Sequence, residues 1–137
     1  METGFTEFES IKLRSSIDNI VQVESYVDQV CQSLDISEDN YGNVLIAVIE
    51  AVNNAIKHGN KEDLNKEVEI SLNELVDRVQ FFVKDEGDGF DYENLPDPTS
   101  PENLEKEHGR GVFLMKTLSD EINFEDNGRC VVITFNK

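Results

Sequence analysis

The sequence predicts an α/β two-layer sandwich in which helices cover one face of a mixed, mostly antiparallel sheet. Three observations lead to this prediction. Two long segments near the N-terminus repeat apolar residues every three or four positions, as amphipathic helices do. Two shorter segments in the middle of the chain have the length and composition of strands. An Asn-Gly pair near the C-terminus separates two further strand-like segments, which is a strong hairpin signal.

The first predicted elements are a strand and two helices. Phe5 to Ser15 alternate weakly between apolar and polar residues, which predicts an edge strand. From Ser16 the period changes to three and four residues, so a helix is expected to reach Leu34. Ser37 is the predicted N-cap of a second helix, and Gly59 marks its expected end.

Two strands are predicted after the second helix, at Glu67–Leu72 and Arg78–Asp85, joined by a short polar turn. The stretch from Gly89 to His108 contains all three prolines and many charges, so we expect a mobile excursion there. A short helix is expected at about Val112–Leu118. The hairpin closes the chain, with strands expected at Glu121–Glu125 and Arg129–Phe135 around Asn127-Gly128.

Length and charge narrow the class of protein. A chain of 137 residues is long enough to close one hydrophobic core, so a single domain is expected over residues 1–137. A formal net charge of −17, from 29 acidic and 12 basic residues, repels phosphate backbones and anionic lipids. We therefore expect neither direct nucleic-acid binding nor membrane binding. The charge suits a partner protein with a basic patch, or it confers solubility alone.

The sequence also bears on location and on the thiols. It shows neither a secretion signal nor an apolar run long enough to span a membrane, so a cytoplasmic location is expected. Cys31 and Cys130 are far apart in sequence, and each lies among apolar residues. We expect two buried thiols rather than a disulfide or a zinc site.

The second helix carries the most informative polar residues. At about 100° per residue, Glu50, Asn54 and Lys57 fall on one stripe opposite the apolar face, with Asn53 and His58 beside it. A carboxamide oxygen suits Mg²⁺, an ammonium suits a phosphate, and a carboxylate can accept a proton. Taken alone, the stripe is better explained as the solvated surface of a helix. The unfavourable Asn-Asn pair inside a helix and two downstream glycine turns favour a ligand site.

The first glycine turn, in VKDEGDGFD, follows the predicted strand that ends at Asp85. Gly87 and Gly89 would let the backbone approach a flat ligand closely. The Asp85 carboxylate could accept a hydrogen bond from an exocyclic amine such as that of adenine. A plain acidic surface turn is the alternative, because Asp-Gly pairs are common in turns.

The second glycine turn, in HGRGVFLMK, places Gly109 and Gly111 before the last predicted helix. Free N–H groups at the start of a helix behind glycines form an anion site. Arg110 either adds positive charge beside a phosphate or projects into solvent. The turn is not a Walker A loop, which ends in Gly-Lys-Ser/Thr, and it lacks the strand–turn–helix context of a dinucleotide-binding fingerprint.

In this order, the motifs resemble those of the GHKL (Bergerat-fold) ATPases over nearly the whole chain. The N box, the G1 box and the G2 box of that family are similar, in turn, to Glu50-x-x-x-Asn54-Ala55, Asp85-x-Gly87-x-Gly89 and Gly109-Arg110-Gly111. The proline-rich segment at about 89–108 corresponds to the ATP lid. The resemblance implies the Bergerat fold and binding of ATP with Mg²⁺.

Within that superfamily, the segments EAVNNAIKHGN and GRGVFLMKTLSDE are most similar to the small anti-sigma-factor serine kinases. Sensor histidine kinases place a second Asn at the position of Glu50 and carry a phosphoacceptor His, whereas the histidines of this chain are His58 and His108. Gyrase-, chaperone- and mismatch-repair-type ATPases carry large additional domains that are not expected here.

The resemblance implies a role for each matching residue. Glu50 is implied as the general base that deprotonates the acceptor serine, Asn54 as the Mg²⁺ ligand, and Asp85 as the adenine-amine contact. Further ATP contacts are implied for Lys57, His58, Gly87, Gly89, Gly109, Arg110, Gly111 and Val112. The chain departs from the family at Asn53, where these kinases often have Thr, and in the three prolines of the lid.

The function implied is that of an ATP- and Mg²⁺-dependent anti-sigma factor that phosphorylates a serine on a STAS-type anti-anti-sigma factor and sequesters a sigma factor. One alternative is a non-catalytic ATP-binding interaction module in a partner-switching pathway, which would not need the base Glu50. Another is a stress-signalling component unrelated to sigma factors. The family commonly forms dimers, and the N-terminal strand and helix could supply the interface of a homodimer, although the sequence leaves the oligomeric state open.

Overall fold

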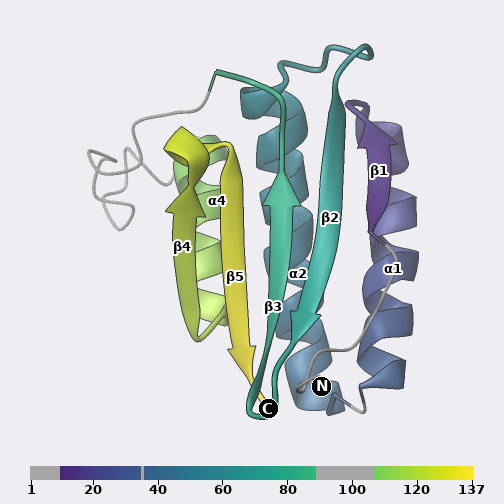
Figure 1. Cartoon of the computed structure of the whole chain (residues 1–137), viewed down its shortest axis with the longest axis vertical. Helices are drawn as coiled ribbons and strands as arrows, with labels where there is room; N and C mark the ends of the chain where they lie inside the picture. Colours follow the sequence, from purple (N-terminus) through teal and green to yellow (C-terminus); the bar gives the residue numbers. More distant parts are fainter. Residues whose placement is uncertain (1–9, 35, 89–106) are drawn as a thin grey trace.

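The computed structural model describes residues 10–34, 36–88 and 107–137. In these residues, helices cover one face of a five-stranded sheet (Figure 1). The strands are β1 (Ile11–Arg14), β2 (Glu67–Glu74), β3 (Arg78–Lys84), β4 (Glu121–Glu125) and β5 (Cys130–Asn136). The helices are α1 (Ile20–Ser33), α2 (Glu38–Asn54) and α4 (Glu107–Leu118). The two-layer α/β architecture is therefore confirmed.

The sheet has the strand order β1-β2-β3-β5-β4, and each neighbouring pair is antiparallel. Within the described residues the sheet is thus antiparallel throughout, which corrects the expectation that it is mixed. β3 and β5 become antiparallel neighbours because the chain crosses over between them through α4 and β4. Alternate residues of β2 and β3 are buried toward the helices, and their cross-strand pairs include Ile70 with Val83 and Leu72 with Phe81.

Each of the two N-terminal helices buries one apolar stripe. In α1, Val23, Val27 and Val30 are fully buried at spacings of four and three residues. Ser37 is the N-cap of α2, as predicted, and its side chain accepts a hydrogen bond from the amide of Asn40. The first turn of α2 is acidic, which suits the positive end of the helix dipole.

The end of α2 differs from a simple glycine stop. Ala55–Gly59 form a π-helical turn, in which the amide of Asn60 donates to the carbonyl of Ala55 over 2.8 Å. The left-handed backbone that reverses the chain comes two residues later, at Lys61 and Glu62, whose φ angles are 54° and 58°. Gly59 therefore ends the helical segment, as predicted, but it does not supply the left-handed turn.

α4 begins at Glu107, five residues before the predicted start at Val112. Gly109, Arg110 and Gly111 consequently belong to the helix instead of a loop before it, which corrects the prediction. Val112 and Met115 are almost completely buried and fix the helix against the core. Burial of this apolar face overrides the low helix propensity of the glycines.

The C-terminal hairpin forms as predicted, with one adjustment at its turn. Asp126, Asn127 and Gly128 are all in the left-handed region, with φ of 53°, 57° and 87°. β5 then begins at Cys130, one residue later than expected. Both cysteines are buried and free, as the sequence predicted. No helix within the described ranges is long and apolar enough to cross a bilayer.

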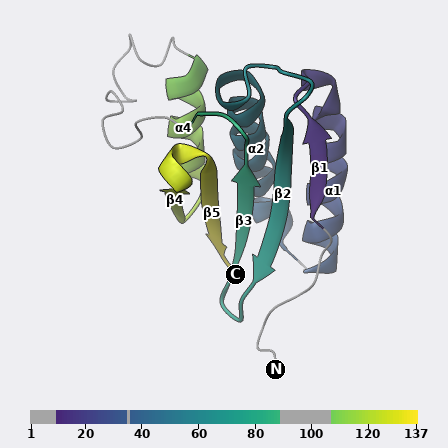
Figure 2. The same cartoon turned by 45° about the horizontal axis from the view of Figure 1, so that its top comes forward.

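Three segments that are distant in sequence meet at one end of the molecule (Figures 1 and 2). They are the end of α2, the carboxyl end of β3, and the β4–β5 turn. The candidate functional residues of the N box and of the first glycine turn lie on the first two of these segments. The fold therefore brings together motifs that are about thirty residues apart in the chain.

Candidate functional site

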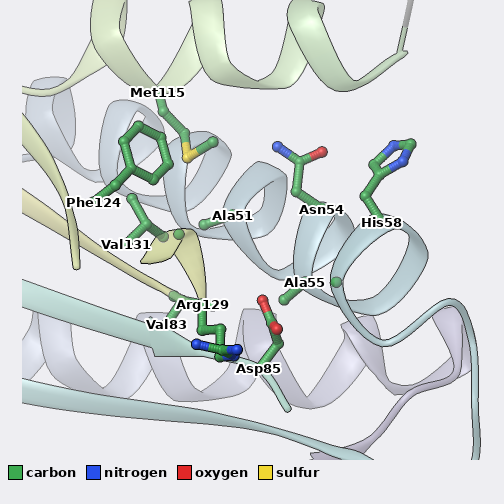
Figure 3. Close-up of a pocket in the computed structure, with 12 residues that line it drawn as sticks. Ala51, Asn54, Ala55, His58, Val83, Asp85, Met115, Phe124, Arg129 and Val131 are labelled. Carbon is green, nitrogen blue, oxygen red and sulfur yellow. The ribbon is translucent and has the colours of Figure 1, made fainter. Parts of the chain in front are cut away.

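A small cavity lies between α2, the sheet, α4 and the β4–β5 turn (Figure 3). Its volume is about 50 Å³. One side is apolar and the other is polar, and Figure 3 shows the Asp85 carboxylate on the polar side near Ala55. The lining residues are Ala51, Asn54, Ala55, His58, Gly59, Val83, Asp85, Met115, Phe124, Gly128, Arg129 and Val131.

Asp85 is held at the polar side of the cavity by its neighbours. It follows β3 directly and is only 8% exposed. Its Oδ1 accepts a hydrogen bond from the Gly87 amide at 2.8 Å, and its own amide donates to the carbonyl of Arg129 at 2.8 Å. Arg129 Nε in turn donates to the Gly87 carbonyl at 2.8 Å. The first glycine turn is thus cross-linked to the hairpin.

The electrostatics of Asp85 are dominated by its burial. Loss of water raises the pKa of the carboxyl group above its ordinary value, and the hydrogen bond from Gly87 and the charge of Arg129 only partly oppose this. A buried carboxylate with one oxygen fixed by a backbone amide is well prepared to accept a further hydrogen bond from a ligand amine.

Asp85→Asn is expected to stabilise the ligand-free protein at pH 7, because the amide is neutral and needs no desolvation of charge. The raised pKa of Asp85 means that its ionisation opposes folding, so this cost is present at neutral pH and disappears as the pH falls through that pKa. The melting temperature of Asp85→Asn should therefore exceed that of wild type at pH 7. The two melting temperatures should converge as the pH is lowered toward about 4, the ordinary pKa of an aspartate side chain. A constant difference from pH 4 to 7 would contradict this.

Two glycines allow α2 and the first glycine turn to pack against each other. A Cβ on Gly59 would lie 2.5 Å from Cγ and Oδ2 of Asp85. A Cβ on Gly87 would overlap the carbonyl of Gly59. The sequence predicted Gly87 as a point of close approach to a ligand, whereas in the structure it is required first for contact with Gly59. Gly59 was predicted only as a helix end.

The glycines give a matched pair of variants. Gly42 lies in α2, and within the described part of the chain a Cβ at this position would have no neighbouring atom within 4 Å, so Gly42→Ala should stabilise the fold by about 0.5–1 kcal/mol. Gly59→Ala should destabilise it by about 1–3 kcal/mol, because the Asp85 carboxylate must move. Urea denaturation of both variants measures the difference. Equal stabilisation by both would show that the Gly59–Asp85 contact is not tight.

The N-box residues Glu50 and Asn54 converge on one point beneath α4. A Cβ on Gly111 would lie 3.1 Å from Glu50 Oε1, 3.1 Å from Asn54 Nδ2 and 3.2 Å from Asn54 Oδ1. The absence of a side chain at Gly111 therefore lets α4 pack closely over both polar groups. Among the residues that the structure describes, buried Asn54 Nδ2 has no hydrogen-bond partner, which is uncommon for a polar atom in a folded protein.

The other predicted residues are placed less centrally. His58 borders the cavity, whereas Lys57 is not among its lining residues. Val112 is 2% exposed and belongs to the hydrophobic core. Gly109 and Arg110 lie in the first turns of α4, and Gly89 and most of the predicted lid (89–108) fall outside the described residues.

Several lining residues were not predicted from the sequence. Met115, Phe124 and Val131 supply much of the apolar wall, and each comes from a different element. Arg129 was predicted only as the first residue of a strand, yet it holds the glycine turn. The Asn-Gly hairpin signal located this turn, but no local pattern could show that it packs beside Asp85.

Residues 13–135 match the family model of the histidine kinase-like ATPase domain. The chain is 37% identical over 100 residues to the serine-protein kinase RsbW of Bacillus subtilis (strain 168), in an alignment that covers 69% of this chain and 62% of that relative. It is 29% identical over 136 residues to the serine-protein kinase RsbW of Staphylococcus aureus (strain JH9), covering 93% and 86%.

The fold also matches a crystal structure of the RsbU and RsbW domains of a Mycobacterium tuberculosis protein. The TM-score is 0.59 at 15% sequence identity, over 94% of this chain and 32% of that one. At this identity the likeness concerns the fold alone.

Proposed function

This chain belongs to the histidine kinase-like ATPase domain family, and we propose that it is an ATP- and Mg²⁺-dependent serine kinase of the anti-sigma-factor type. Its protein substrate would be a STAS-type antagonist, and it would also sequester a sigma factor. The observation that carries the proposal is the convergence of Glu50 and Asn54 beside a cavity whose polar side holds Asp85. Two relatives bear the name serine-protein kinase.

The adenine base is assigned to the cavity. Asp85 would accept a hydrogen bond from the exocyclic amine, with Gly87 next to the base. The apolar side, with Met115, Phe124 and Val131, suits the faces of a flat aromatic ring. This combination of an apolar slot and one oriented polar group is typical of small-molecule sites.

Asn54 fits the role of a magnesium ligand. Its Oδ1 lies close to Gly111, and its Nδ2, which has no partner among the described residues, would donate to a phosphate oxygen while Oδ1 binds the metal. A carboxamide oxygen is a ligand that Mg²⁺ accepts. The described residues contain no group of three or more His, Cys, Asp or Glu side chains that could hold a metal ion. Magnesium commonly takes few protein ligands and completes its shell with phosphate oxygens and water, and it would neutralise charge on the phosphates.

Glu50 is assigned as the general base. The serine hydroxyl oxygen of the partner would form a bond to the γ-phosphorus as the bond from that phosphorus to the β–γ bridging oxygen breaks and ADP leaves. The hydroxyl proton would pass to the Glu50 carboxylate. Positioning and charge stabilisation supply most of the catalysis in such transfers, and the base contributes the proton acceptor.

Nucleotide entry requires this end of the molecule to open. The cavity of about 50 Å³ is far smaller than the roughly 300 Å³ at which ligand pockets begin. Gly111 of α4 lies directly over Glu50 and Asn54. We therefore assign the opening to the first turns of α4. From the family resemblance, we also propose that ATP contacts Lys57, His58, Gly89, Gly109, Arg110 and Val112.

Phosphate transfer to a STAS-domain protein tests the function. The chain is incubated with γ-labelled ATP, Mg²⁺ and each STAS-domain protein encoded in the same genome, and the product is mapped by mass spectrometry. We expect one phosphoserine on one such protein and none when EDTA is present. If no candidate is phosphorylated but one binds more tightly with ATP, the chain is a nucleotide-dependent binding module instead of a kinase.

A further inference from the structure

Asn60, immediately after the π-helical turn, is a buried polar residue that the proposed chemistry does not use. The Asn60 side chain is only 1% exposed, and each of its hydrogen-bonding groups has a protein partner that replaces water. Nδ2 donates to Ser15 Oγ at 2.9 Å and to the carbonyl of Glu67 at 3.0 Å. Oδ1 accepts from the amide of Glu86 at 2.8 Å. Complete satisfaction of a buried amide indicates a specific structural task.

The partners of Asn60 belong to three separate segments. Ser15 follows β1 and donates its own hydroxyl proton to the carbonyl of Lys66 at 2.7 Å. Glu67 begins β2, and its amide donates to the carboxylate of Glu86. Glu86 lies between Asp85 and Gly87, in the first glycine turn. One side chain thus joins the end of α2, the start of the β1–β2 edge and the turn that bears Asp85.

Asn60 controls Asp85 from two directions. First, Asn60 accepts a hydrogen bond from the amide of Glu86, the residue between Asp85 and Gly87. This holds the turn in which the Gly87 amide donates to Asp85 Oδ1. Second, Asn60 closes the π-helical turn through its own backbone and so places Gly59, which packs against the Asp85 carboxylate. The position and the orientation of this carboxylate therefore both depend on Asn60.

We propose that Asn60 is a positioning residue that sets the preference of the site for a 6-aminopurine over a 6-oxopurine nucleotide. This inference rests on the proposed role of Asp85 as acceptor for the adenine amine. A purine with a carbonyl at that position offers no amine donor and would leave the buried carboxylate facing an oxygen. The penalty for that mismatch depends on how rigidly the carboxylate is held, because a mobile carboxylate can turn away.

Only an amide fits this position. Its two N–H groups serve Ser15 and Glu67, and its oxygen serves Glu86. Asn60→Leu keeps a similar volume but removes all three hydrogen bonds, and so releases the first glycine turn. Ser15→Ala removes one partner of the Asn60 amide and leaves the other two, so its effect should be smaller in the same direction.

The experiment compares Mg·ATP with Mg·ITP by titration calorimetry on the whole chain, below the melting temperature of each variant. Wild type should bind ATP more tightly. The ratio of the two dissociation constants should fall about tenfold in Asn60→Leu, which corresponds to roughly one lost hydrogen bond. It should fall less in Ser15→Ala. Val44→Ala is the control, because this fully buried residue of α2 lines a different pocket, together with Leu34 and Phe135, and is not among the residues that line the cavity.

A merely structural role for Asn60 would lower the melting temperature without changing the base preference, as expected for Val44→Ala. An unchanged ratio in folded Asn60→Leu, or in Ser15→Ala if Asn60→Leu does not fold, would overturn this inference alone. Equal affinity of wild type for ATP and ITP would overturn the assignment of Asp85 and this inference with it. A wild type that binds neither nucleotide would overturn the proposed function itself.

Discussion

Replacing Glu50 with glutamine is expected to slow phosphate transfer by about 10²–10⁴-fold while leaving the affinity for ATP nearly unchanged. Glutamine keeps the size and the hydrogen-bonding capacity of the side chain but cannot accept the proton of the serine hydroxyl. Glu50 Oε1 and the Asn54 carboxamide both lie close to Gly111 beneath α4, so a hydroxyl that approaches there after α4 moves aside would meet both groups. The measurement is the single-turnover rate of transfer from labelled ATP to the STAS partner.

The control for this variant is Glu38→Gln, which removes a carboxylate from the first turn of the same helix, at its other end. It should lower stability slightly through the helix dipole and leave the transfer rate unchanged. If Glu50→Gln transfers phosphate as fast as wild type, Glu50 is not the base. If Glu50→Gln loses ATP binding as well, its role is in the nucleotide site instead.

Asn54→Ala is expected to abolish detectable binding of Mg·ATP and to leave the fold intact. The side chain lies off the apolar stripe of α2, and its Nδ2 is buried without a partner, so truncation removes an unsatisfied polar atom. The metal-dependent part of the affinity should be lost, because the carboxamide oxygen is the proposed ligand. Calorimetry with a non-hydrolysable ATP analogue, with and without Mg²⁺, measures this.

Asn53→Ala is the matched control, since it removes an identical side chain at the preceding position of α2. It should bind Mg·ATP as wild type does and unfold cooperatively at a similar temperature. Unchanged Mg·ATP affinity in Asn54→Ala would refute the magnesium assignment. A parallel loss in both variants would point to damage of the helix as a whole.

Much of the fold could be predicted because it follows local rules. The Ser37 cap, the apolar stripes of α1 and α2 and the Asn-Gly hairpin are each specified within a few residues. The antiparallel pairing of β3 with β5 could not be predicted, because it depends on the path of the chain through α4 and β4. The start of α4 at Glu107 likewise depends on packing against α2, which outweighs the glycines.

In the candidate site, too, local features could be predicted from the sequence, whereas contacts between distant segments could not. Spacing and residue type made Glu50, Asn54 and Asp85 candidates, the family resemblance implied their roles, and the structure brings Glu50 and Asn54 together beside Gly111. The roles of Gly59, Asn60 and Arg129 were not identified, because each depends on a contact with a residue 26 to 45 positions away. A hydrogen bond between such distant segments leaves no periodic trace in the sequence.

The proposed function requires the cavity beside Asp85 to bind ATP, and calorimetric titration of wild type and Asp85→Asn with Mg·ATP at pH 7 measures whether it does. We expect one bound nucleotide per wild-type chain and a large loss of affinity in Asp85→Asn. The Asp85→Asn variant replaces one carboxylate oxygen, which is an acceptor, with an NH2 group, which is a donor. It should nevertheless be at least as thermally stable as wild type. Equal affinity in the two proteins, or no binding by wild type, would contradict the claim.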